Sequence, residues 1–120
     1  MTVKNTGFPS PAEEYREGSL SLDKHLIKNP SATYFMTMEG DSMLPTIRPG
    51  DILMIDRSLT PVGGNLIVGN LQGEFIVRRL ILKNGERFLV NEKQTSSIKL
   101  LESEDFVLFG VVSWTIHKAI

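Results

Sequence analysis

Cysteine is absent from this chain of 120 residues. The absence excludes a disulfide framework and a thiolate metal site, and a reducing cytosol is the compartment that suits such a chain. The two histidines, His25 and His117, are far apart in the sequence and show no paired ligand spacing. We therefore expect neither a metal centre nor a bound cofactor.

An excess of positive charge is also missing. Against 13 lysine and arginine residues stand 14 aspartate and glutamate residues, which gives a formal net charge of −1 at pH 7. A domain whose main partner is bare nucleic acid usually has a basic surplus, because neutralising phosphates drives that binding. The composition therefore argues against strong direct DNA binding by this chain alone.

Long hydrophobic runs are missing as well. The longest, such as residues 52–55, are far too short to cross a bilayer, and the polar first six residues contain no apolar signal core. We expect a soluble cytoplasmic protein without a membrane partner. The length and the hydrophobic content of 41% suit one domain with a single core.

The first eighteen residues are predicted to form an extended amino-terminal arm. The stretch Phe8-Pro9-Ser10-Pro11 favours this structure, because proline fixes the backbone φ angle and lacks an N–H group. Residues 19–120 show neither an internal repeat nor a low-complexity tract. We expect them to fold as one domain.

One short helix is predicted at the start of this domain. Ser21 can cap it, with Lys24 at the third helical position, and the pair Asn29-Pro30 stops it. Its short apolar stripe consists of Leu22, Leu26 and Ile27.

From Ser31 onward the chain shows short runs typical of β-strands, with turn residues between them. The turn Asn84-Gly85 is a strong hairpin signal. Regular spacing of short strands predicts a mostly β domain, a folded-over sheet or partly open barrel. The predicted strands cover residues 33–38, 51–56, 66–68, 74–82 and 87–90, and residues 106–116 give one or two strands broken near Gly110.

A serine in a tight turn follows the first predicted strand, within Gly40-Asp41-Ser42-Met43. Because Gly40 lets the backbone turn sharply, Ser42 could present its Oγ atom beside backbone N–H groups that are candidate oxyanion donors. Asp41 and Met43 belong to this turn. On its own the pattern is more typical of an ordinary turn serine than of a nucleophile.

Two adjacent arginines lie in the predicted strand that begins Gly73-Glu74-Phe75. Neighbouring residues of a strand face opposite sides of the sheet. One of Arg78 and Arg79 is therefore expected to point towards the core and the other towards solvent. Two solvated charges at a strand end are the alternative that the pattern leaves open.

Three motifs in this order resemble the signature of the LexA and UmuD autopeptidases: Gly40-Asp41-Ser42-Met43, Pro49-Gly50-Asp51-Ile52-Leu53 and Gly73-Glu74-Phe75-Ile76-Val77. The arm from Gly7 to Tyr15, residues 29–35 and the ending Phe109-Gly110-Val111-Val112 are similar to UmuD in particular. The resemblance covers residues 7 to about 119. It implies a LexA/UmuD-type folded β-sheet with one short amino-terminal helix and an extended arm.

In that family a serine at the position of Ser42 attacks a peptide bond in the protein's own arm or in a partner's arm, and a lysine on a later strand is its base. The resemblance places that lysine at Arg78. The residue after Arg78 is Arg79, so a shift of one position does not supply a lysine either. No lysine lies between Lys28 and Lys83. A guanidinium stays protonated and has no lone pair that could take a proton. We therefore expect the chain to be inactive or strongly impaired as a peptidase.

The resemblance also places the scissile bond at Thr6–Gly7, with only six residues ahead of it. The chain is therefore expected to correspond to the processed form of a UmuD-like protein. The resemblance implies a homodimer that joins a Y-family (UmuC-like) DNA polymerase and a RecA filament in copying past DNA lesions during the SOS response. Residues 106–116 are the expected dimer strand, because their alternation exposes an apolar edge. Trp114 and Phe109 are either its anchors or ordinary core residues.

Two rival functions stay open. The first is an active serine autopeptidase of the LexA/UmuD type that tolerates arginine or recruits another base. The second is the dimerisation domain of a LexA-like repressor. That reading expects an upstream helix-turn-helix domain, for which we expect no room before Gly7.

Overall fold

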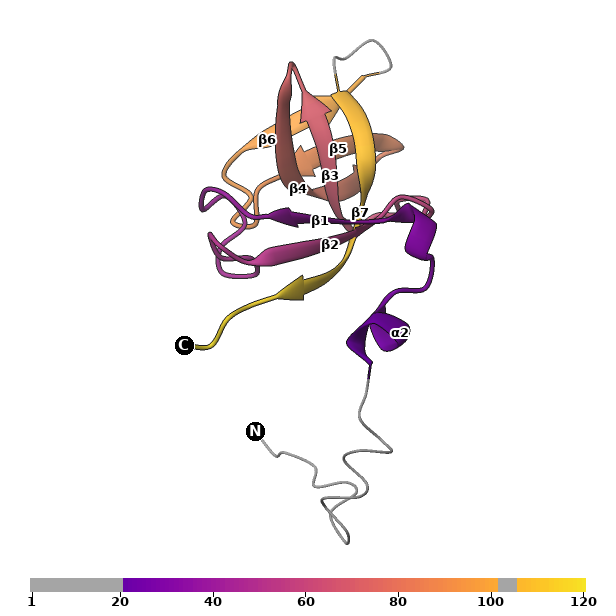
Figure 1. Cartoon of the computed structure of the whole chain (residues 1–120). Coiled ribbons are helices and arrows are strands. Elements are labelled where there is room, and N and C mark those ends of the chain that lie inside the picture. Colours follow the sequence, from indigo (N-terminus) through magenta and orange to yellow (C-terminus); the bar gives the residue numbers. More distant parts are fainter. Residues whose placement is uncertain (1–20, 102–105) are drawn as a thin grey trace, which may run out of the picture.

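The computed structural model describes residues 21–101 and 106–120 (Figure 1). The predicted arm, with the Thr6–Gly7 bond, lies outside these residues. The described part forms one sheet of seven strands in the order β1-β2-β7-β3-β4-β5-β6, and all neighbouring strands are antiparallel. The strands are β1 (Thr33–Thr37), β2 (Ile52–Asp56), β3 (Leu66–Leu71), β4 (Glu74–Lys83), β5 (Glu86–Val90), β6 (Ser97–Leu100) and β7 (Phe106–Ile116).

The sheet folds over without closing into a barrel, since β1 and β6 remain at its two edges. Figure 1 shows β1 and β2 running across one end of the β3–β6 part, while the long strand β7 passes through both parts. The mostly β, partly open fold predicted from the sequence is confirmed. Among residues 21–101 and 106–120, no helix is long and apolar enough to cross a membrane.

The short helix α2 (Leu22–Leu26) begins at its predicted cap. The Ser21 hydroxyl accepts a hydrogen bond from the Lys24 N–H at 3.4 Å, which satisfies one of the unpaired amides at the helix start. The helix ends earlier than expected, because Ile27 is already extended and Pro30 opens a separate 3₁₀ turn, η1 (Pro30–Ala32). None of the residues of α2 is buried, and Figure 1 shows the helix standing apart from the sheet.

The hairpin between β4 and β5 forms where the sequence predicts it. Asn84 and Gly85 have φ angles of 53° and 75°, the left-handed values that a tight two-residue hairpin turn requires. The turn fixes the pairing of Lys83 with Glu86 and, further along, of Arg79 with Val90. This register matters below, because it brings the chain just after β5 close to Arg79.

Strand β7 differs from its prediction in two ways. It is one continuous strand whose register shifts against both neighbours, so the expected break near Gly110 is wrong. It also lies inside the sheet: Phe106 to Val111 pair with β3, and Val111 to Ile116 pair with β2. Each half of β7 therefore has a hydrogen-bonded neighbour on one side, and among the described residues no strand pairs with its other side, so the expected open edge is found for each half separately and not for the strand as a whole.

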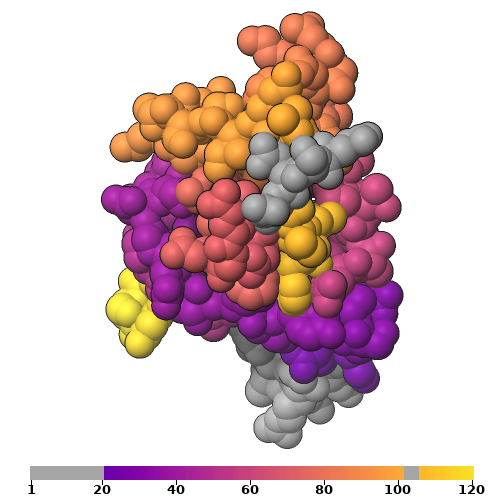
Figure 2. Space-filling view, turned by 90° about the horizontal axis from the view of Figure 1, so that it is seen from above, coloured from indigo at the N-terminus to yellow at the C-terminus, as the bar shows by residue number. Residues whose placement is uncertain are grey.

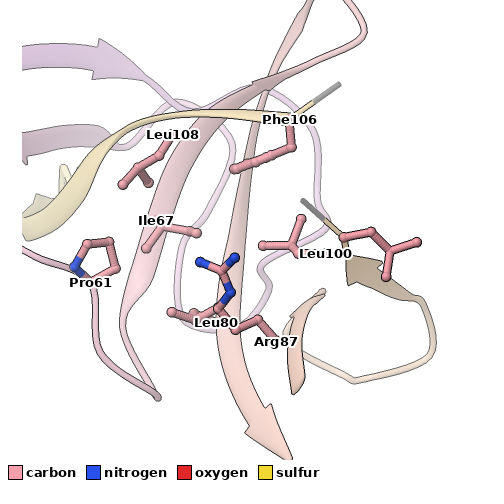
Figure 3. A pocket seen from close by; sticks show the side chains of 8 residues that line it. Pro61, Ile67, Leu80, Arg87, Leu100, Phe106 and Leu108 are labelled. Carbon is pink, nitrogen blue, oxygen red and sulfur yellow. The ribbon is translucent and has the colours of Figure 1, made fainter. Parts of the chain in front are cut away.

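Strand β6 was not predicted from the sequence. It is only four residues long, and its polar surroundings hide the alternation of Ile98 and Leu100, which pack against a core cluster formed by Ile67, Leu80, Leu89 and Val111. Beside this cluster lies a pocket of about 190 Å³. Its lining residues are Pro61, Ile67, Leu80, Arg87, Leu100, Leu101, Phe106 and Leu108 (Figure 3).

Candidate active site

The turn that carries Ser42 is held at the base of the loop between β1 and β2. The Met38 N–H donates to the Asp51 carbonyl, and the Gly50 N–H donates to the Met38 carbonyl, each at 2.8 Å. Gly40 adopts a φ of 78°, a left-handed value that a residue with a Cβ atom rarely takes. The backbone therefore reverses sharply just before Ser42, as its sequence predicts.

Two side chains of the same loop anchor the turn in the core. Met43 and Ile47 are both 0% exposed, and they belong to the cluster that includes Met38, Leu53 and Val68. Ser42 itself is half-buried. The serine thus sits at the boundary between the core and the surface, with its backbone fixed by a buried neighbour.

The structure brings Arg78 of β4 to Ser42 although 36 positions separate them. The Arg78 Nη1 group donates to Ser42 Oγ at 3.0 Å and to the Val77 carbonyl at 2.7 Å. Partial burial lowers the pKa of Arg78, but a guanidinium starts so high that it remains a cation in water. Within the described residues, no lysine amine hydrogen-bonds to the Ser42 hydroxyl.

Arg79 is bound differently from its neighbour. Its Nε and Nη2 groups donate to Oε1 and Oε2 of Glu92, each at 2.7 Å, and its Nη1 group donates to the Gly64 carbonyl at 2.5 Å. The expectation that one of the two arginines points to solvent is wrong, since both are half-buried and hydrogen-bonded within the chain.

Glu92 connects this ion pair to the serine turn, because its N–H donates to the Ser42 carbonyl at 3.0 Å. The hydrogen bond from Arg79 lowers the pKa of Glu92 and raises that of Arg79. Sequence reasoning missed Glu92. The one available signal was the hairpin register, which pairs Arg79 with Val90, two residues before Glu92.

The roles expected for Asp41 and Met43 in the oxyanion turn, and for Thr6 and Gly7 as the cleavage site, stay predictions. The Leu44 N–H donates to the Asp41 carbonyl at 3.2 Å, and the Ile47 N–H donates to the Met43 carbonyl at 2.9 Å. Among the described residues, none accepts a hydrogen bond from the amide N–H of Ser42 or Met43. Both amides therefore retain their donor capacity at the turn.

A second polar cluster ties the carboxy-terminal tail to the same loop. His117 Nδ1 lies 2.7 Å from Asp51 Oδ1, and Arg48 Nη1 lies 3.2 Å from His117 Nε2. The hydrogen bond from the Arg48 amide is the main cause of a lowered pKa at Asp51, and His117 adds to it. Figure 2 shows the yellow carboxy-terminal end beside the purple segment of the chain. In residues 21–101 and 106–120, no group of three or more His, Cys, Asp or Glu side chains could hold a metal ion.

Replacing Glu92 with glutamine is expected to lower the free energy of unfolding at neutral pH by roughly 1–2 kcal/mol, because the charge-assisted bonds to Arg79 are lost. Since the pair lowers the pKa of Glu92 below its ordinary 4.5, its stabilisation is complete above that pH. It disappears as the pH falls through the lower, folded-state pKa. Urea unfolding at pH 7 and in steps below pH 4.5 measures both effects.

The matched control is Glu86→Gln, which removes the more exposed ion pair with Lys99 and should cost less. The difference in stability between Glu92→Gln and the unaltered chain should shrink as the pH falls. A difference that stays constant down to acid pH would contradict this role of the pair.

Comparison with known proteins agrees with the geometry. Residues 2–113 match the family described as Peptidase S24-like. Protein ImpA of Salmonella typhimurium is 36% identical over 113 residues, which cover 93% of this chain and 77% of ImpA. Protein MucA of Escherichia coli is 44% identical over 80 residues, which cover 66% of this chain and 55% of MucA.

A third relative is the LexA repressor of Acidithiobacillus ferrooxidans, which is 42% identical over 111 residues. The match covers 88% of this chain and 54% of the repressor, so the chain spans about half the length of that relative. The resemblance drawn from the three ordered motifs is thereby confirmed. The chain belongs to the Peptidase S24-like family, the serine-peptidase family of the LexA- and UmuD-type proteins.

Proposed function

We propose that this protein is a UmuD-like accessory subunit of an error-prone translesion DNA polymerase in the SOS response to DNA damage. We further propose that it acts by binding its partners and cleaves little or nothing itself. The similarity to ImpA and MucA over most of the chain supports the UmuD-like assignment. The observation that carries the second part is the 3.0 Å contact between Ser42 Oγ and the Arg78 guanidinium.

The chemical reason is the direction of that hydrogen bond. A serine nucleophile must give its proton to a base as it attacks, and in a Ser–Lys pair a neutral amine takes it. Arg78 has only N–H donors, so Ser42 Oγ accepts the bond and the guanidinium cannot remove the hydroxyl proton. Loss of a general base commonly removes about 10²–10⁴ of the rate.

We propose that the protein binds its partners, a Y-family DNA polymerase and a RecA filament, as a homodimer. The carboxy-terminal half of β7 suits the dimer contact: Trp114 is 47% and Ile116 is 41% exposed. Within the described part of the chain, no strand pairs with residues 112–116 on the side opposite β2. Phe109 is less suited, because it packs edge-on against Tyr34 and Phe75 of its own chain.

Affinity capture tests the assembly directly. The immobilised protein is expected to retain RecA filaments and a Y-family polymerase, and sedimentation should give the mass of a dimer. Ser42→Ala is the matched control, and it should capture both partners as well as the unaltered chain does, since binding does not use the hydroxyl as a nucleophile. Failure to retain either partner would contradict the assembly role.

A second candidate function is the dimerisation domain of a LexA-like repressor, which the 42% identity to a LexA repressor favours. The net charge of −1 gives this domain no basic surplus for holding DNA itself. In the capture experiment, this function predicts a dimer that is retained by RecA filaments and not by any Y-family polymerase.

A further inference from the structure

The two adjacent arginines use different edges of their guanidinium groups. Arg79 presents its Nε and Nη2 groups side by side to the two oxygens of Glu92, at 2.7 Å each. Arg78 uses only Nη1, which donates to Ser42 Oγ and to the Val77 carbonyl. Among residues 21–101 and 106–120, no acceptor takes the Nε or Nη2 donors of Arg78. The edge that binds a carboxylate in Arg79 is therefore unused in Arg78.

This unused edge of Arg78 is not fully buried within the described part of the chain. Every fully buried side-chain nitrogen or oxygen in the described part of the chain has a hydrogen-bond partner. Because the Nε and Nη2 atoms of Arg78 have none there, they are not fully buried, although the residue as a whole is only half-exposed. Among the described residues, these two donors are therefore neither hydrogen-bonded nor fully enclosed.

Arg78 also lacks a counter-ion within the described residues. The ion pairs found there join Arg79 to Glu92, Lys99 to Glu86 and His117 to Asp51. Burial lowers the pKa of Arg78, which means that the surroundings disfavour its charge without compensating it. A half-buried cation without a partner is stabilised by an anion that binds beside it.

Further donors belong to the Ser42 turn that Arg78 contacts. Since Ser42 Oγ accepts its hydrogen bond from Arg78, the hydroxyl proton remains available to another acceptor. The amide N–H groups of Ser42 and Met43 also have no acceptor among the described residues. The nearby carbonyls each accept a hydrogen bond, that of Ser42 from the Glu92 N–H and that of Val77 from Arg78. The site therefore offers several hydrogen-bond donors for which the described residues supply no acceptor.

We propose that the Ser42–Arg78 site is a carboxylate-binding site. The Nε and Nη2 groups of Arg78 would hold the two oxygens of the ligand, as Arg79 holds Glu92, and the Ser42 hydroxyl would donate to one of them. The carboxylate comes either from the end of a peptide or from an acidic side chain. This inference goes beyond the proposed function, because it gives the serine position a ligand and requires no partner protein and no bond cleavage.

Three acetylated tripeptides test the site by NMR titration of the ¹⁵N-labelled chain. The first is tri-alanine with a free carboxylate, the second is its amide, and the third is the amide with glutamate in the middle. The free acid is expected to shift the Arg78 Nε–H resonance and to bind about tenfold or more tightly than the amide. The third peptide shows whether an acidic side chain serves as well as a peptide end.

The control variants separate this site from general attraction between charges. Arg78→Gln should remove the preference for the free acid, Arg78→Lys should keep part of it, and Arg87→Gln, in the separate pocket of Figure 3, should change nothing. The titration is repeated with Glu13, Glu14 and Glu17 changed to glutamine. Tighter peptide binding in that variant would show that the chain's own arm supplies the carboxylate. Equal affinity for acid and amide, or no shift at Arg78 in either form, would overturn the proposal.

Discussion

Replacing Arg78 with lysine is expected to increase cleavage next to Gly7 by about 10²–10⁴. The substrate is a fusion that supplies a longer segment ahead of the Thr6–Gly7 bond. A lysine amine can lose its proton, which half-burial facilitates by lowering the amine's pKa, and it can then accept the proton of Ser42. A time course at alkaline pH, followed by mass spectrometry of the products, measures the change.

Two variants show whether the gain comes from the serine and its new base. Arg79→Lys is the matched control: it introduces the same residue one position along the strand and leaves the contact between Ser42 and Arg78 in place. It should not raise cleavage. Adding Ser42→Ala to Arg78→Lys should abolish the gain. If Arg78→Lys cleaves no faster than the unaltered chain, position 78 is not where this fold holds its base.

The second large effect is expected from Met43→Ala, which should lower the free energy of unfolding by about 2–5 kcal/mol. Met43 is 0% exposed and lies in the main core cluster with Ile47 and Leu53. Truncation removes buried apolar atoms and leaves a cavity directly beneath the Ser42 turn. Urea unfolding at neutral pH gives the change in free energy.

Met36→Ala is the control for this measurement, because it makes the same substitution in a side chain that is only partly buried against the same cluster. Its cost should be clearly smaller. A loss for Met43→Ala no larger than that for Met36→Ala would mean that the serine turn is not anchored through its neighbour.

Features encoded by neighbouring residues could be predicted from the sequence. The serine cap of α2 and the hairpin at Asn84-Gly85 both follow from local backbone chemistry, and both are found where expected. The strands with strong alternation were also located to within a few residues. Such features depend on contacts close in sequence, which the order of residues states directly.

Features that depend on distant pairing could not be predicted in the same way. The place of β7 between β2 and β3 arises from pairing with strands whose residues lie far from it in the sequence. The polar residues around β6 hid its two inward side chains. Both elements are set by which strand faces which, and local propensity does not contain this information.

The candidate site also combines features set by neighbouring residues with features set by contacts between distant residues. Ser42 was identified from its own turn, but its proximity to Arg78 across 36 positions followed only from the resemblance to a family. Glu92 was missed because a lone glutamate after a strand is normally a solvated charge. The register of the β4–β5 hairpin pairs Arg79 with Val90 and so brings Glu92, two residues later, close to Arg79 and to the serine turn.

The most direct test of the central claim is the cleavage assay on the unaltered chain. The protein is incubated with the longer-arm fusion over a range of alkaline pH, in parallel with its Ser42→Ala variant. We expect the same negligible cleavage from both, because the hydroxyl of Ser42 faces a permanent cation. Clear cleavage that disappears in Ser42→Ala would contradict the claim and identify the protein as an active autopeptidase.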